Sequence, residues 1–224
     1  LTICLLKNNK KKYKNNNMKT LTKELQSAIT PALALELLKD GNKRFVNNLK
    51  INRNLLQQAN ETSDGQHPFA VILSCIDSRT SAELIFDQGL GDVFSVRIAG
   101  NIVNEDILGS MEFGCKVAGA KIIVVLGHTK CGAVKGACDG VALGNLTGLI
   151  AKIKPAVEQE SITAENRNSS NGVFVENVAE LNVSLSVKNI LLKSPIIADM
   201  VKNGDIGIVG GIHDITTGEV KFFE

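Results

Sequence analysis

Two short apolar segments, residues 69–75 (FAVILSC) and 121–126 (KIIVVL), place the strongest constraint on how this chain folds. Continuous apolar runs of this length are typical of strands that are buried on both faces, as in a parallel sheet. Between them a further strand, the second in chain order, is expected at residues 93–98, and helices are expected at 81–86 and 105–118. Strands that alternate with helices predict an α/β fold with a mostly parallel central sheet flanked by helices.

An N-terminal helical arm is expected to begin at Pro31, because Thr30 is a favourable N-cap and proline is favoured as the first helical residue. Gly41 is a candidate interruption of this helix, and the polar residues 52–66 are expected to form a connector. The apolar stripe of the helix recurs at helical spacing and consists of Leu35, Leu38, Phe45 and Leu49.

The C-terminal part is expected to complete the alternation of helices and strands. Helices are predicted at residues 146–158 and 175–192, and a short helix restarts at Ser194 and Pro195. Strands are predicted at 206–209 and 219–223. The last strand follows a tight turn, so it is expected to lie antiparallel at an edge of the sheet.

Length and composition favour a single domain. The 224 residues, of which 44% are hydrophobic, suffice for one buried core, and this domain is expected to span residues 18–224. Residues 1–17 are expected to be a disordered tail or a non-native extension, with Met18 as the natural start. No apolar run approaches the roughly 20 residues that a membrane-spanning helix needs. The net charge of +2 gives no reason to expect a nucleic acid partner.

The cysteines bear on the compartment. The chain has five cysteines without regular disulfide spacing, and its N-terminal residues do not have the pattern of a secretory signal. Both observations favour a reducing, cytoplasmic setting, in which cysteines bind metal, do chemistry or pack as small apolar residues.

Five residues with chemically active side chains follow the ends of the first and third predicted strands. Cys75 ends the first strand, and Asp77 and Arg79 come directly after it. His128 follows the third strand, and Cys131 lies three residues later. Ligands of parallel sheets bind at the carboxyl ends of the strands, and thiolate with imidazole is a ligand set that zinc favours. Three protein ligands leave a fourth position open, as a catalytic zinc site requires.

Each part of this pattern also has a simpler interpretation. A single His-x-x-Cys pair is more often incidental than metal-binding, and a single buried cysteine usually packs in a core. Cys115 and Cys138 lack a surrounding motif and are expected to pack in this way. Asp77 and Arg79 taken alone would indicate a turn cap beside a surface ion pair. The interpretation as a zinc site therefore depends on the joint placement of the residues.

The segments 75–79 (CIDSR) and 128–132 (HTKCG) together resemble the signature of the β-class carbonic anhydrases. This resemblance implies an enzyme, a carbonic anhydrase (carbonate dehydratase, a zinc hydro-lyase), with one zinc ion per chain bound by Cys75, His128 and Cys131. It covers roughly residues 31–224 and is carried further by the segments 81–88, 96–101, 109–113 and 125–128.

The resemblance also implies the reaction, which is reversible hydration of CO2 to bicarbonate and a proton by attack of zinc-bound hydroxide. Asp77 would accept the hydrogen bond of the hydroxide, and Arg79 would fix Asp77 and keep it ionised. Gln88 and the backbone N–H of Gly132 match positions near bound CO2 or bicarbonate, so both are expected to bind substrate.

Two more expectations follow from the resemblance. In some members the aspartate displaces water from zinc, and such members often bind bicarbonate through a Trp and a Tyr. This chain has no Trp and its single Tyr is Tyr13, so Asp77 is expected to stay paired with Arg79 beside a water-ligated zinc near neutral pH. The family forms dimers or larger assemblies through N-terminal helices. A homodimer or homotetramer is therefore expected. The apolar stripe of the helix that begins at Pro31 would equally fit packing on the sheet of the same chain.

Two other functions remain open at the level of the sequence. The same scaffold would serve a related heterocumulene, such as carbonyl sulfide or carbon disulfide, if the pocket shape favoured it. The second alternative is a non-catalytic zinc or redox-sensing module, in which Cys75 and Cys131 respond to oxidation. His67 and His213 lie outside the metal motif and are expected to be structural or on the surface.

Overall fold

The computed structural model describes residues 20–223, so the expectations for residues 1–17 lie outside the described part. Five strands form one sheet in the order β2-β1-β3-β4-β5. The strands are β1 (Ala70–Ser74), β2 (Val93–Arg97), β3 (Ile122–His128), β4 (Gly207–His213) and β5 (Val220–Phe222). Strands β1 to β4 are parallel and β5 is antiparallel to β4. This arrangement confirms the predicted mostly parallel sheet with an antiparallel edge strand.

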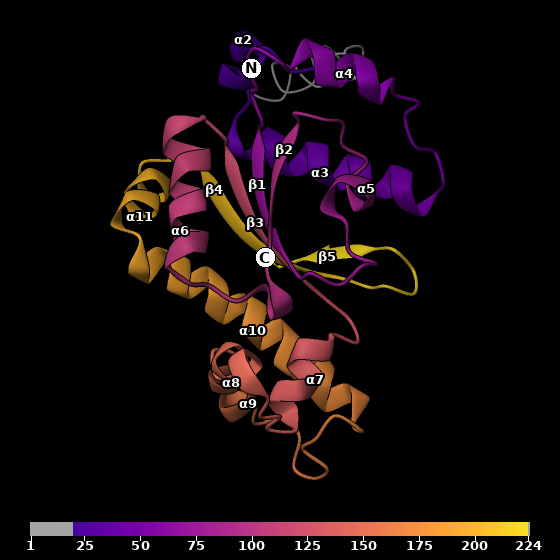
Figure 1. Cartoon of the computed structure of the whole chain (residues 1–224), viewed down its shortest axis with the longest axis vertical. Helices are drawn as coiled ribbons and strands as arrows, with labels where there is room; N and C mark the ends of the chain where they lie inside the picture. Colours follow the sequence, from indigo (N-terminus) through magenta and orange to yellow (C-terminus); the bar gives the residue numbers. More distant parts are fainter. Residues whose placement is uncertain (1–19, 224) are drawn as a thin grey trace.

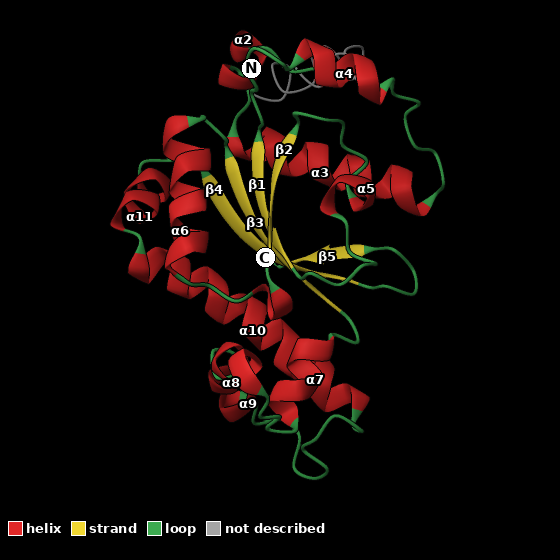
Figure 2. Cartoon of the chain, in the orientation of Figure 1, coloured by secondary structure: helices red, strands yellow, loops and turns green. Residues whose placement is uncertain are grey.

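Helices cover both faces of the sheet (Figures 1 and 2). They are α2 (Lys23–Ser27), α3 (Pro31–Val46), α4 (Leu55–Glu61), α5 (Ala82–Ile85), α6 (Glu105–Glu112), α7 (Gly132–Cys138), α8 (Gly144–Ile150), α9 (Lys154–Gln159), α10 (Gly172–Lys193) and α11 (Pro195–Lys202). Helices α3 and α5 pack on one face, and α6, α10 and α11 pack on the other. Within residues 20–223, no helix is both long enough and apolar enough to cross a membrane.

Strands β1 and β3 form the centre of the sheet and are buried along their whole length. Successive residues of a strand point to opposite faces, so Val71 joins the core under α10 whereas Ile72 joins the core under α3. Burial on both faces explains why these two strands are continuous apolar runs in the sequence. The register places Ser74 opposite Leu126, so the residues that follow β1 lie beside the last residues of β3.

Helix α3 starts as predicted, with the Thr30 side chain as its N-cap. Gly41 does not interrupt the helix. It is buried where α3 meets the segment after α5, and a Cβ at this position would lie 1.8 Å from the Phe86 carbonyl oxygen. Leu38 packs on the sheet of its own chain, whereas Leu49 lies beyond the end of the helix and is 68% exposed. The helical arm thus covers one face of its own sheet.

Several segments differ from the expectation. Residues 52–66 contain α4, whose buried Gln58 accepts the Leu90 N–H through its side chain. The polar composition conceals this helix because a hydrogen bond, not an apolar stripe, anchors it. The single helix expected at 146–158 is divided into α8 and α9, and α6 continues into a π-helical turn (Phe113–Val117).

Strand β4 extends beyond the expected residues 206–209 and reaches His213. Gly210 and Gly211 conceal this extension because glycine is unfavourable inside a strand. A Cβ on Gly210 would lie 2.7 Å from a methyl group of Val183 in α10, so glycine allows the helix to approach the sheet. The longer strand brings its last residue opposite His128 of β3.

Replacing Gly41 with alanine is expected to destabilise the fold by about 1–3 kcal/mol, because the new methyl group would overlap backbone that has little freedom to move. The free energy of unfolding in urea measures this change. Gly148→Ala is the matched control, since Gly148 lies in α8 and a methyl group added there would meet no atom within 4 Å. The control is expected to be neutral or up to about 1 kcal/mol more stable. Equal effects of the two substitutions would contradict the close-packing role of Gly41.

Candidate metal centre and active site

Three side chains with metal-binding atoms converge where β1 and β3 end. Cys75 directly follows β1, His128 is the last residue of β3, and Cys131 immediately precedes α7. Their ligand atoms lie within 4.8 Å of one another, and all three residues are buried. The structure therefore brings together the three residues that the sequence indicated as a metal site.

Hydrogen bonds around the two sulfur atoms favour a thiolate. Cys75 Sγ lies 4.0 Å from Cys131 Sγ and accepts the Gly100 backbone N–H at 3.4 Å. The Cys131 thiol, with smaller contributions from His128 and backbone N–H groups, holds the pKa of Cys75 well below its usual value despite burial. Cys75 and burial in turn raise the pKa of Cys131. The opposite directions of these two pKa shifts favour a thiolate at Cys75 and a thiol at Cys131.

The His128 ring leaves one nitrogen available to a metal ion. Its Nδ1 lies 2.9 Å from the Thr129 carbonyl oxygen, which fits a tautomer that donates from Nδ1. Its Nε2 is buried and has no hydrogen-bond partner among the described residues. A buried nitrogen without a partner is costly, and coordination of a metal ion would remove this cost. Two sulfur atoms and this nitrogen form a donor set that fits a metal ion such as zinc.

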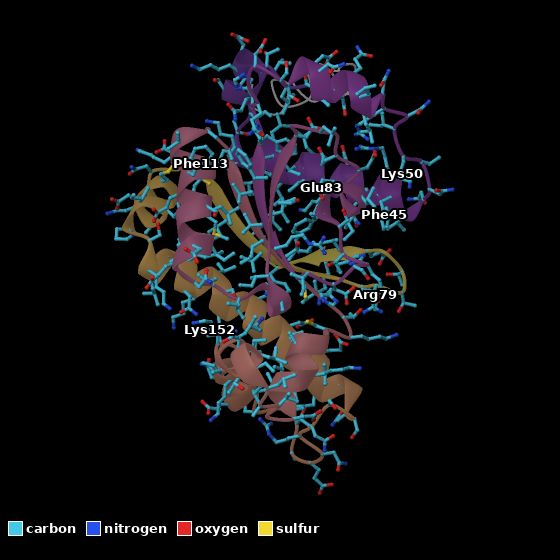
Figure 3. The ribbon with its side chains drawn as sticks, viewed as in Figure 1. Phe45, Lys50, Arg79, Glu83, Phe113 and Lys152 are labelled. Atoms are coloured by element: carbon cyan, nitrogen blue, oxygen red, sulfur yellow. The ribbon has the colours of Figure 1, made fainter. Side chains whose placement is uncertain are left out.

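Asp77 and Arg79 form an ion pair beside the three ligands. Arg79 donates from Nε to Asp77 Oδ1 at 3.0 Å and from Nη2 to Oδ2 at 2.8 Å. These hydrogen bonds hold the pKa of Asp77 well below its usual range. Asp77 Oδ2 lies 4.0 Å from Nε2 of His128, so the carboxylate borders the ligand group. Figure 3 shows Arg79 near the end of the sheet where the parallel strands finish.

Helix α10 braces the loops that carry the ligands. Its Glu176 Oε1 accepts the backbone N–H of Lys130, which lies between His128 and Cys131, at 2.9 Å. Its Asn182 Nδ2 donates to the carbonyl oxygen of Gly100 at 2.8 Å, and Gly100 supplies the N–H for the Cys75 sulfur. Sequence reasoning missed both residues. Polar residues within a long helix are common, and nothing in their spacing relates them to loops far away in the sequence.

The two residues expected to bind substrate lie in different places. Gly132 is the first residue of α7, directly after Cys131, and the space around its Cα is open. The Gln88 side chain instead donates to the Phe86 carbonyl oxygen at 2.5 Å and lines a cavity of about 320 Å³ between α4 and α5. None of the three candidate ligands lines this cavity. Within one chain, the structure does not bring Gln88 to the metal-binding group.

His213 is buried opposite His128, and neither of its ring nitrogens has a hydrogen-bond partner within residues 20–223. Burial, with a smaller contribution from His128, lowers the pKa of His213 to about 4. The ring is therefore neutral near pH 7. His67 is half-buried in the connection that precedes β1.

Comparison with known proteins places the chain in a family. A sequence profile described as "Carbonic anhydrase" matches residues 70–220. "Carbonic anhydrase 2" of Mycobacterium tuberculosis is 35% identical over 195 residues, which cover 84% of this chain and 90% of the relative. A solved β-carbonic anhydrase of Aspergillus fumigatus superposes with a TM-score of 0.67 at 27% identity, covering 86% of this chain and 90% of that chain. The chain belongs to the β-carbonic anhydrase family.

Other members of the family match over similar lengths. A carbonic anhydrase of Mycolicibacterium smegmatis is 34% identical over 193 residues, covering 85% of this chain and 92% of the relative. One of two tetrameric β-carbonic anhydrases from Sordaria macrospora superposes with a TM-score of 0.66 at 26% identity, covering 86% of this chain and 94% of that chain.

The lowered pKa of His213 predicts how the free energy of unfolding of this chain depends on pH. The unfolded chain takes up a proton on this histidine below about pH 6.5, whereas the folded chain does so only near pH 4. The contribution of His213 to stability is therefore complete at pH 8 and falls by about 2 kcal/mol between pH 7 and pH 5. Urea unfolding of the metal-free protein at the two pH values measures this decrease in the free energy of unfolding. The His213→Gln variant is expected to lose about 2 kcal/mol less than the wild type, because its side chain takes up no proton. If the variant and the wild type lose the same stability between these pH values, the prediction is wrong.

Proposed function

We propose that this chain is a zinc-dependent carbonic anhydrase that catalyses the reversible hydration of CO2 to bicarbonate and a proton. The observation that carries the proposal is the convergence of Cys75, His128 and Cys131 beside an Asp77 carboxylate that is itself held by Arg79. A purely structural metal site has no need of an oriented carboxylate at its border. Family membership supports the same reaction.

The three ligands would hold one zinc ion per chain. Zinc bound there supplies a Lewis acid that makes hydroxide available near neutral pH. The chain contributes the ligand geometry, through the ends of β1 and β3, and a buried setting that limits the access of bulk water. Two thiolates offset the charge of the metal ion more than imidazoles would, so groups around the site must compensate. The Gly100 N–H that bonds to Cys75 Sγ withdraws charge from one of the sulfur atoms.

Asp77 is proposed to orient the attacking oxygen. Its Oδ1 accepts from the backbone N–H and from Nε of Arg79, so this oxygen is occupied. Its Oδ2 accepts one bond from Arg79 and borders His128, which leaves a lone pair free on the side of the ligand group. Oδ2 would accept a hydrogen bond from the attacking oxygen and direct the oxygen's lone pair towards CO2. Arg79 keeps Asp77 ionised and therefore able to accept this bond.

Gly132 and Gln88 are proposed to bind CO2 or bicarbonate. The N–H of Gly132, as the first of α7, has no partner within the helix and is available to an oxygen of the substrate. Gln88 does not reach the ligand group of its own chain, so its role requires a second subunit. We infer a homodimer or homotetramer, which is supported by the tetrameric β-carbonic anhydrases of Sordaria macrospora.

Cys131→Ala is expected to lose zinc, because removal of one thiolate leaves two ligands and sharply weakens coordination. Cys138→Ala is the matched control, since Cys138 is only partly buried and lies outside the ligand group. Zinc content per chain after gel filtration and stopped-flow CO2 hydration test both variants and the wild type. The control is expected to match the wild type. Zinc content in Cys131→Ala equal to that of the wild type would refute the ligand assignment.

Asp77→Asn is expected to keep zinc and to lower kcat by about 100-fold, because the amide has the shape of the carboxylate but presents a donor and lacks the charge. Arg79→Lys retains the positive charge and loses the paired geometry, so a smaller decrease is expected. Stopped-flow CO2 hydration and zinc content measure these effects. An Asp77→Asn variant with the wild-type rate would show that Asp77 does not act in the reaction.

A further inference from the structure

Residues 75–77 connect the proposed ligand Cys75 with the proposed hydrogen-bond acceptor Asp77, and they lie beyond the end of β1. Backbone pairing between β1 and β2 ends with Arg97, the last residue of β2. Cys75 is buried in the core, whereas Ile76 is 61% exposed, so apolar packing does little to hold the part of the segment that leads to Asp77. Other contacts must therefore help to keep the Cys75 sulfur and the Asp77 carboxylate at a constant spacing.

The Arg97 side chain supplies such contacts with a single guanidinium group. Its Nε donates to the Cys75 carbonyl oxygen at 3.0 Å, and its Nη2 donates to the Asp77 carbonyl oxygen at 2.7 Å. Because the Arg97 backbone belongs to β2, these bonds tie the segment to the neighbouring strand.

Thr80 also bonds the same two oxygens. Its Oγ1 lies 3.4 Å from the Cys75 carbonyl oxygen and 3.0 Å from the Asp77 carbonyl oxygen. Thr80 comes only three residues after Asp77, so these bonds close the loop on itself. They do not fix the loop relative to the sheet, whereas the bonds from Arg97 do.

We propose that Arg97 is a positioning residue for the metal centre, which holds the backbone on both sides of Ile76 and thereby sets Cys75 Sγ relative to the Asp77 carboxylate. The inference rests on the proposed function, in which Cys75 binds metal and Asp77 acts on the reacting oxygen. A planar guanidinium suits this role because it presents two donors in a fixed geometry, whereas a lysine ammonium is a point charge on a flexible stem. Groups that orient metal ligands typically contribute about 10–100-fold to metal affinity or activity.

The two arginines at this site act on different parts of it. Arg79 bonds the carboxylate of Asp77, so its loss should change the rate and leave the metal in place. Arg97 bonds the backbone next to the ligand as well as that of Asp77, so its loss should weaken metal binding and the rate together. This difference separates the proposed role from a general effect of positive charge.

The test uses the full chain with Arg97→Met, Arg97→Lys and the control Lys152→Gln, which removes an exposed charge between α8 and α9 (Figure 3). Zinc affinity is measured by competition with a chromophoric chelator, and ligand geometry by the visible spectrum of the Co(II)-substituted protein. Stopped-flow kinetics give kcat and KM, and thermal unfolding of the metal-free protein gives Tm.

Arg97→Met is expected to show an altered Co(II) spectrum, zinc affinity weaker by about 10–100-fold, and a decrease in kcat that exceeds any change in KM. Arg97→Lys is expected to lie between Arg97→Met and the wild type, and Lys152→Gln to match the wild type. The metal-free Tm should be similar in all four proteins.

Wild-type zinc affinity and an unchanged Co(II) spectrum in both Arg97 variants would overturn the inference while leaving the proposed function intact. A lower metal-free Tm with unchanged zinc affinity would also overturn it, because Arg97 would then serve the fold alone. A wild-type protein without zinc affinity or CO2 hydration would refute the proposed function, and the inference with it.

Discussion

Parallel pairing between β1 and β3 brings together two segments that are far apart in the sequence. Both strands are buried on both faces, so a shift of their register by one residue would move every side chain into the opposite core and lose its fitted packing. The register is therefore strongly determined, and it places Cys75 beside the end of the strand that carries His128. The core therefore brings the two strand ends together, and the contacts from α10 and Arg97 act on an arrangement that the sheet has already set.

Much of this arrangement could be predicted from the sequence because it depends on local patterns. The apolar runs of β1 and β3 indicate buried strands, and the residues just after them indicate a site at the carboxyl edge of the sheet. Cys75, His128 and Cys131 could be identified for this reason, and the structure brings them together. The pairing of Asp77 with Arg79 is equally local, since the two residues are neighbours in one turn.

Contacts between distant segments could not be predicted in this way. Glu176 and Asn182 brace loops more than 40 residues away in the sequence, and a single sequence contains no sign of such pairs. Gly41 and Gly210 look unfavourable for a helix and a strand, yet each is required where another segment approaches closely. Gln88 illustrates the opposite limit, because the motif predicts a residue near the substrate and the structure places it away from the ligand group of its own chain.

The separation of the ligands in the sequence has a consequence for how the protein matures. Cys75 and Cys131 are 56 residues apart, so the ligand group does not exist until the ribosome has synthesised both strands and they have paired. The brace on their loops comes later still, because α10 begins at Gly172. A nascent chain can therefore carry all three candidate ligands and lack the helix that braces their loops. Stable binding of the proposed metal ion would accordingly follow the synthesis of most of the chain.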